Sequence, residues 1–178
     1  DKEWEEFKEM YKEVNLPFWM QTRAETLVMK PERVAELKEL GCHRVSMGLE
    51  HGNEEFRKKV IVKAFSNEYM VEAARLLAEQ RIALTINNII GFPGETRELV
   101  FDTIAINRKL VGVDTTNVAV FAPFHGTPLR DLCLSKGYIS EDHYCGKPNT
   151  TTSLKSIAGI SPKELEGLRK TFALYARM

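Results

Sequence analysis

The sequence has few of the features that mark secreted, membrane or nucleic-acid-binding proteins. Its three cysteines, Cys42, Cys133 and Cys145, are too few and too widely spaced for a disulfide framework, and they favour a reducing compartment. No apolar run approaches the roughly 20 residues that span a bilayer, and the charged amino terminus has no signal-peptide core. With 25 basic and 25 acidic residues, no excess charge attracts nucleic acid. We therefore expect a cytoplasmic protein with no membrane or nucleic-acid partner.

What the sequence does contain is the composition of an ordinary globular domain. Its 178 residues, 43% hydrophobic and 28% charged, suffice for one domain with a sizeable core. The first residue is not methionine, and the last five residues carry no stop signal of their own. We therefore expect the chain to be a piece of a longer protein.

Strand and helix patterns alternate along the chain. Apolar periodicity predicts strands over 18–22, 43–50, 83–90 and 116–123, and helices over 3–14, 31–40, 66–77, 96–110 and from 161 onward. A charged segment over 53–59 is expected to form one or two helical turns, and 137–153 is expected to be a loop. This order predicts an α/β fold with parallel strands joined by right-handed crossovers.

Both a Rossmann sheet and a (β/α) barrel fit that alternation, and the strand composition favours the barrel. Strands covered by helices on both faces are apolar throughout, whereas here Ser46, Gly48 and Glu50 alternate with apolar residues. Four strands cannot close a barrel, which takes about 250 residues. We therefore predict a partial, TIM-like (β/α) barrel over residues 1–136, with a loop and a helix over 137–178 appended to it.

The carboxyl ends of the predicted strands are where functional groups gather in parallel α/β folds. Strand alternation places Gln21, Glu50, Asn87 and Phe121 on the lumenal side. Their polar members suit a ribose or an ammonium group as hydrogen-bond partners. No metal site is predicted, because the His and Cys residues between 125 and 145 match no standard zinc spacing.

Three ordered motifs resemble one enzyme family. The segments 41–54 (GCHRVSMGLEHGNE), 86–96 (INNIIGFPGET) and 121–129 (FAPFHGTPL) are similar to the fourth, fifth and sixth strands of radical S-adenosylmethionine (radical SAM) enzymes. Gln21-Thr22-Arg23 lies where those enzymes often end the third strand. The likeness covers roughly residues 16–130 and is strongest to the branch whose members often carry a cobalamin-binding domain.

The resemblance implies a function and a set of binding residues. The chain would supply strands three to six of a six-strand barrel in an enzyme that cleaves S-adenosylmethionine to a 5′-deoxyadenosyl radical, which then attacks a small-molecule substrate. Residues implied to bind S-adenosylmethionine are Gln21, Arg23, Glu50, Lys63, Asn87, Ile89, Gly91 and Phe121. Implied cofactors are S-adenosylmethionine, a [4Fe–4S] cluster and, for this branch, cobalamin.

The family's C-x-x-x-C-x-x-C cluster loop is absent, because the three cysteines lie 91 and 12 residues apart. The cluster ligands are therefore expected outside this chain, on missing amino-terminal barrel strands or a domain, and the chain alone is expected to be inactive. The exposed edge strand at 18–22 is expected to favour self-association. Two alternatives stay open: a non-catalytic barrel fragment that serves as a binding module, and an unrelated barrel enzyme with Glu50 and His51 as acid and base.

Overall fold

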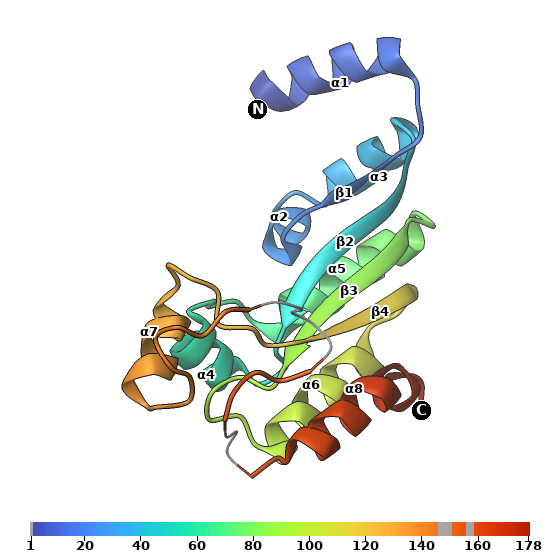
Figure 1. The fold of residues 1–178 in the computed structure, drawn as a ribbon. Helices are drawn as coiled ribbons and strands as arrows, with labels where there is room; N and C mark the ends of the chain where they lie inside the picture. Colours follow the sequence, from blue (N-terminus) through green and yellow to red (C-terminus); the bar gives the residue numbers. More distant parts are fainter. Residues whose placement is uncertain (1, 146–150, 156–158) are drawn as a thin grey trace. The chain divides into compact units, whose positions relative to one another are not determined.

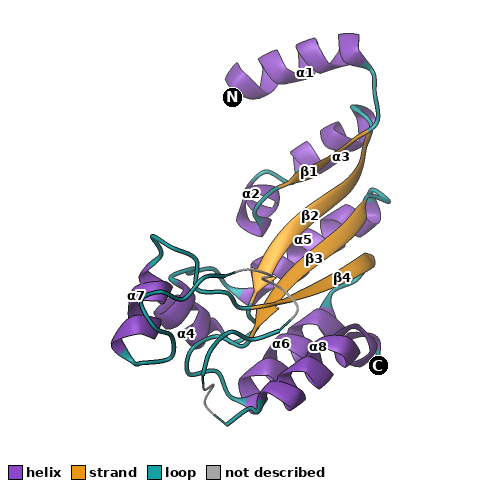
Figure 2. Cartoon of the chain, viewed as in Figure 1, coloured by secondary structure: helices purple, strands orange, loops and turns teal. Residues whose placement is uncertain are grey.

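The structure, a computed structural model, describes residues 2–145, 151–155 and 159–178, so part of the predicted loop over 137–153 lies outside it. Four parallel strands form one sheet in the order β1-β2-β3-β4 (Figures 1 and 2). The strands are β1 (Phe18–Gln21), β2 (Cys42–Glu50), β3 (Ala83–Ile90) and β4 (Val113–Val120). The helices are α1 (Lys2–Val14), α2 (Ala24–Met29), α3 (Glu32–Glu39), α4 (Glu54–Phe56), the π-helix η1 (Arg57–Ile61), α5 (Asn67–Glu79), α6 (Arg97–Lys109), α7 (Pro128–Ser135) and α8 (Pro162–Arg177).

The chain divides into two compact units. Unit 1 comprises residues 1–48, 68–86 and 110–115, and unit 2 comprises residues 49–67, 87–109 and 116–178. Strands β2, β3 and β4 begin in unit 1 and end in unit 2. Because functional groups of parallel α/β folds lie at the carboxyl ends of strands, unit 2 holds most of the candidate site.

Unit 1 is held together by apolar side chains of β2 and of the helices that precede and follow it in sequence, α3 and α5. Val45 and Met47 of β2 are buried, as are Leu37 of α3 and Leu77 of α5. Helix α1 has no buried residue, and its Trp4 and Lys8 side chains donate hydrogen bonds to Glu36 of α3. Helix α1 therefore docks through these hydrogen bonds together with ring contacts of Phe7 and Tyr11 with Phe18 of β1.

Unit 2 has a core built from the ends of β3 and β4 together with α6 and α8. Helices α6 and α8 lie side by side (Figure 1), and Arg108 Nε of α6 donates to the Tyr175 carbonyl of α8 at 2.8 Å. Helix α8 starts with a capping box between Ser161 and Glu164, as its sequence predicts, and buries Phe172. This core supports the strand ends that carry the predicted site residues.

Most predicted elements are confirmed, and the differences have local causes. Strand β3 has the predicted bounds, whereas β4 begins and ends three residues before the predicted 116–123. Helix α7 was not predicted, although Thr127 caps it and Pro128 occupies its first turn. The charged segment over 53–59 is helical, as expected, and forms α4 and the start of η1. No helix in the described part of the chain is long and apolar enough to span a membrane.

Candidate functional site

The predicted site residues divide between the two units. Six belong to unit 2: Glu50, Lys63, Asn87, Ile89, Gly91 and Phe121. Gln21 and Arg23 belong to unit 1, where Gln21 ends β1 opposite Ser46 of β2 and the exposed Arg23 forms an ion pair with Glu25 at 2.7 Å. Unit 2 is thus where the structure brings predicted residues into contact.

Glu50 lies at the centre of a tight three-residue turn at the end of β2. Its φ is 61°, in the left-handed region, and the His51 amide donates to the Leu49 carbonyl across it at 2.7 Å. A non-glycine residue in this conformation is strained, and such strain concentrates at functional sites. The Glu50 side chain is mostly buried and forms an ion pair with Lys63, with Oε1 and Nζ 2.8 Å apart. Glu50 and Lys63, both predicted from the sequence as binding residues, are therefore in contact.

A buried arginine shapes the segment that delivers Lys63. Arg57, the first residue of η1, is fully buried and stacks over the Phe65 ring at 3.9 Å. Its guanidinium donates to the His51 and Phe65 carbonyls and, at 2.9 Å, to Asn67 Oδ1. The chain then turns through Val62, whose φ is 59°, directly before Lys63. Sequence reasoning missed Arg57, because a basic residue in a charged segment usually faces solvent.

Asn87 lies on the predicted lumenal side of β3, next to an asparagine of β4. The Asn117 side-chain amide donates to Asn87 Oδ1 at 3.0 Å. On the opposite face of β3, buried Asn88 exchanges hydrogen bonds with Asn107 of α6 and donates to the Asn117 carbonyl at 3.0 Å. Asn117 is thus a candidate that sequence reasoning missed, although it lies within the predicted strand 116–123 and alternation places it on the same face as Phe121.

The turn after β3 is fixed by Glu95, whose side chain is fully buried. Its Oε2 atom accepts from the amides of Gly91 and Phe92, and its own amide donates to the Phe92 carbonyl at 3.0 Å. Gly91 has a φ of 85°, and a Cβ there would lie 2.8 Å from Leu165 Cδ2. Only glycine meets both conditions at this position.

The apolar members of the predicted set surround the same turn. Ile89 is half-buried, and Phe121 is buried with its amide donating to the Ile90 carbonyl at 2.8 Å. The Phe121 ring centroid lies 5.1 Å from that of Phe92. The ends of β3 and β4 therefore place a backbone turn beside apolar and aromatic side chains, most of them buried.

The cysteines do not fit an iron–sulfur cluster. Burial raises the pKa of the Cys42 thiol, and burial also raises the pKa of Cys133 to about 11. A coordinating metal would deprotonate such thiols, so the test is whether enough of them gather at one site. Within the described residues, no group of three or more His, Cys, Asp or Glu side chains is placed to hold a metal ion.

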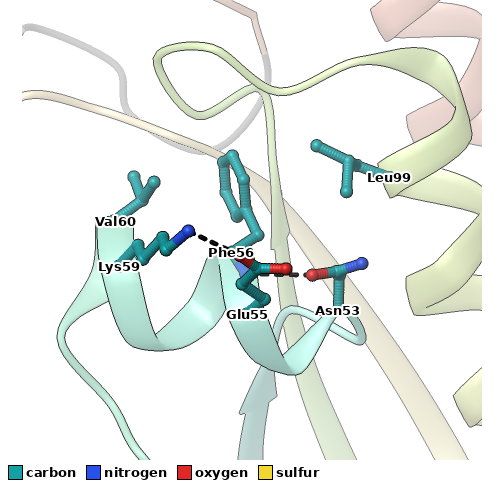
Figure 3. A pocket seen from close by; sticks show the side chains of 6 residues that line it. All are labelled: Asn53, Glu55, Phe56, Lys59, Val60 and Leu99. Carbon is teal, nitrogen blue, oxygen red and sulfur yellow. Dashed lines mark hydrogen bonds and ion pairs between the residues drawn. The ribbon is translucent and has the colours of Figure 1, made fainter.

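Unit 2 also has an open pocket of about 260 Å³ on the segment that follows β2. It is lined by Asn53, Glu55, Phe56, Lys59, Val60 and Leu99 (Figure 3). Phe56, Val60 and Leu99 supply apolar walls, and Lys59 forms an exposed ion pair with Glu55. None of the sequence-predicted site residues lines this pocket, so we do not assign the predicted chemistry to it.

The geometry defines a class of protein: a parallel α/β domain with charged, polar and apolar groups at the carboxyl ends of its strands. Comparison with known proteins identifies the family, since a family model described as the radical SAM superfamily matches residues 1–105. The chain therefore belongs to the radical SAM superfamily, a superfamily of enzymes.

Curated relatives match parts of the chain. A tRNA-2-methylthio-N(6)-dimethylallyladenosine synthase of Lachnoclostridium phytofermentans is 33% identical over 92 residues, which are 51% of this chain and 20% of that protein. An uncharacterized methyltransferase of Pyrococcus horikoshii is 30% identical over 109 residues, which are 61% of this chain and 23% of that protein. The match thus spans about a fifth of the length of these relatives.

Solved structures confirm the fold class. Coproporphyrinogen III oxidase from Escherichia coli, described as a radical SAM enzyme, superposes with a TM-score of 0.64 and 16% identity over 96% of this chain and 35% of its own. Methylornithine synthase superposes with a TM-score of 0.61 and 17% identity over 97% of this chain and 42% of its own. The α/β partial barrel expected from the strand composition is therefore confirmed.

Proposed function

We propose that this chain carries an S-adenosylmethionine-binding part of a radical SAM enzyme, with the ion pair of Glu50 and Lys63 receiving the methionine moiety. That moiety carries an ammonium and a carboxylate, which are complementary in charge to Glu50 and Lys63. The two side chains already lie 2.8 Å apart at a strained turn, and this observation carries the proposal. On binding, charge-assisted hydrogen bonds to the ligand replace the internal pair.

The remaining residues are assigned to the nucleoside. Asn87 offers its amide to the ribose, and Ile89, Gly91 and Phe121 surround the adenine. Support comes from the polar and apolar character of the strand ends and from superfamily membership. Gln21 and Arg23, at the end of β1, are assigned to the same ligand by their place in the family pattern.

The chemistry belongs to the cofactors, while the chain binds, orients and excludes water. A reduced [4Fe–4S] cluster held outside this chain would supply the one electron that cleaves S-adenosylmethionine to methionine and a 5′-deoxyadenosyl radical. Because the cysteines do not fit a cluster, we propose that its ligands come from another segment or chain and that this chain alone does not cleave S-adenosylmethionine. After anaerobic treatment with iron, sulfide and dithionite, the chain should release no 5′-deoxyadenosine, as measured by liquid chromatography.

Cobalamin stays a proposal for the whole protein. One structural neighbour, the methyltransferase TsrM from Kitasatospora setae, was solved with cobalamin and a [4Fe–4S] cluster bound, and it superposes with a TM-score of 0.55 at 19% identity. That likeness shows a shared fold. Titration of hydroxocobalamin into the full-length protein, followed by its visible absorption, tests the proposal.

The two alternatives lead to different observations. An acid–base role for Glu50 and His51 is disfavoured, because His51 is fully buried and cannot reach a substrate. A binding module without chemistry would bind S-adenosylmethionine, yet the full-length protein would release no 5′-deoxyadenosine with a reductant. Release by the full-length protein excludes that alternative.

The decisive experiment removes one charge of the ion pair and compares two ligands by calorimetric titration. Lys63→Met should weaken S-adenosylmethionine binding roughly tenfold or more, since a charge-assisted hydrogen bond contributes about 1.5–3 kcal/mol. The same variant should leave the affinity for 5′-methylthioadenosine unchanged, because that ligand lacks the amino acid moiety.

Lys59→Met is the matched control, since Lys59 forms an exposed ion pair with Glu55 on the same segment. It should alter neither affinity. A wild-type chain that binds neither ligand, or a Lys63→Met chain that binds S-adenosylmethionine as the wild type does, contradicts the proposed function.

A further inference from the structure

A buried histidine and a buried glutamate face one another between the two turns of the candidate site. His51 and Glu95 are both fully buried, and His51 Nε2 lies 3.1 Å from Glu95 Oε1. The alignment falls short of a regular hydrogen bond, and within the described residues neither atom has another polar partner. A buried polar atom needs a polar partner, and for these two atoms the other one is the nearest at hand among the described residues.

The protonation of His51 follows from its other nitrogen. The Asn53 amide donates to His51 Nδ1 at 3.0 Å, so Nδ1 is an acceptor and carries no proton. A neutral imidazole has one donor and one acceptor, which places the proton on Nε2, facing Glu95. His51 therefore directs an N–H group at the buried carboxylate, with Nε2 and Oε1 3.1 Å apart. Its ring also stacks on Phe56, with centroids 4.5 Å apart.

Each partner of the pair holds one of the two turns. The backbone amide of His51 closes the turn around Glu50, and its carbonyl accepts from Arg57. The second oxygen of Glu95 accepts from the amides of Gly91 and Phe92. Movement of either side chain therefore displaces a turn that the proposed function assigns to S-adenosylmethionine.

We propose that His51 is a positioning residue: its Nε2–H group holds the Glu95 carboxylate and thereby aligns the Gly91 turn with the Glu50 turn. His51 contacts no ligand itself, since it is fully buried. Its effect on ligand binding rests on the proposed function, whereas its effect on the Gly91 turn rests on the contacts of the folded chain alone.

Three variants separate hydrogen bonding from packing. His51→Phe keeps an aromatic ring beside Phe56 but removes the donor, whereas His51→Gln keeps a donor at a similar distance from the backbone. Phe56→Leu is the control, because it removes the stacking on His51 and the edge contact with the Phe92 ring but leaves the pair with Glu95 intact.

Hydrogen exchange of the Gly91 and Phe92 amides, measured by NMR, is the first readout. Both amides should exchange roughly tenfold faster in His51→Phe, since a carboxylate without its donor holds them less firmly. They should return towards wild-type rates in His51→Gln and stay near them in Phe56→Leu. The second readout is affinity for S-adenosylmethionine, which should fall about tenfold in His51→Phe and recover in His51→Gln.

Several outcomes would overturn the inference. Unchanged exchange of both amides in His51→Phe removes the positioning role, and so does a His51→Gln chain as defective as His51→Phe. If His51→Phe does not fold, the ¹⁵N chemical shifts of His51 in the wild type decide, because a proton on Nδ1 instead of Nε2 contradicts the inference. If the variants show the expected exchange rates but the wild-type chain binds no S-adenosylmethionine, the proposed function is refuted and the positioning role of His51 stands.

Discussion

Replacing Glu50 by glycine or by alanine removes the same carboxylate but should affect folding differently. Glu50 has a φ of 61°, a conformation that costs a non-glycine residue about 1–2 kcal/mol. Glycine avoids this strain, although it loses roughly 0.5–1 kcal/mol more conformational entropy on folding. The Glu50→Gly chain should therefore be more stable than the Glu50→Ala chain by about 1 kcal/mol, which corresponds to roughly 2–4 °C in Tm.

The ion pair with Lys63 does not disturb this comparison, because both variants lose it. Lys63 is 49% exposed, so the pair contributes little to stability, at most about 1 kcal/mol. Affinity, unlike stability, should not distinguish the two variants. Both should bind S-adenosylmethionine about one to two orders of magnitude more weakly than the wild type, since each 1.4 kcal/mol corresponds to roughly tenfold in affinity.

Thermal unfolding by circular dichroism and calorimetric titration measure the two effects. Glu55 of α4 supplies a matched control. Because glycine in a helix destabilises a protein by about 1 kcal/mol relative to alanine, Glu55→Gly should be less stable than Glu55→Ala, the reverse of the order at Glu50. If the Glu50→Gly chain unfolds at a lower temperature than the Glu50→Ala chain, the inference of a strained turn is refuted. Unchanged affinity in both would remove Glu50 from the site, and equal loss of affinity and stability would make its role structural.

Four further predictions concern stability, pH, thiol reactivity and assembly. Gly52→Ala should lower the free energy of unfolding by about 1–3 kcal/mol, because its Cβ would lie 2.5 Å from the backbone of α6. Gly167→Ala in α8 should raise the free energy of unfolding by about 0.5–1 kcal/mol, because a Cβ there meets open space. Urea titration measures both changes. Hydrogen bonds from Lys8 and Trp4 lower the pKa of Glu36 below its usual 4.5. The ionised carboxylate therefore stabilises the fold above pH 4.5, and this stabilisation is lost as the pH falls through the folded-state pKa. Melting curves between about pH 5 and 3 should show that loss in the wild type and not in Glu36→Gln. Iodoacetamide at pH 8 should modify Cys145 before the two buried cysteines, and mass spectrometry would contradict this if the order were reversed. Strand β1 is an edge of the described sheet, so the chain should self-associate through it, and a strictly monomeric chain in sedimentation at high concentration counts against this.

The sequence by itself determined the elements whose signals are local. The alternation of apolar and polar residues predicts the faces of β2 and β3, because side chains in a strand point to opposite sides in turn. The Ser161 and Glu164 capping box predicts the start of α8, because it satisfies backbone donors within one helical turn. The family motifs at the strand ends predict the candidate site, whose role stays a prediction; two of its residues, Glu50 and Lys63, are in contact.

Only the tertiary structure decided which charged residues are buried and what they hold. Arg57, His51 and Glu95 belong to polar stretches of sequence, yet all three are fully buried. Their partners are backbone groups or side chains up to 44 positions away, as in the pair of His51 and Glu95. No local pattern encodes such a contact, because burial of a charge is favourable only once distant segments have brought its partners together. The strained φ of Glu50 likewise follows from the His51 and Arg57 contacts that surround it, and not from any turn residue in its own segment.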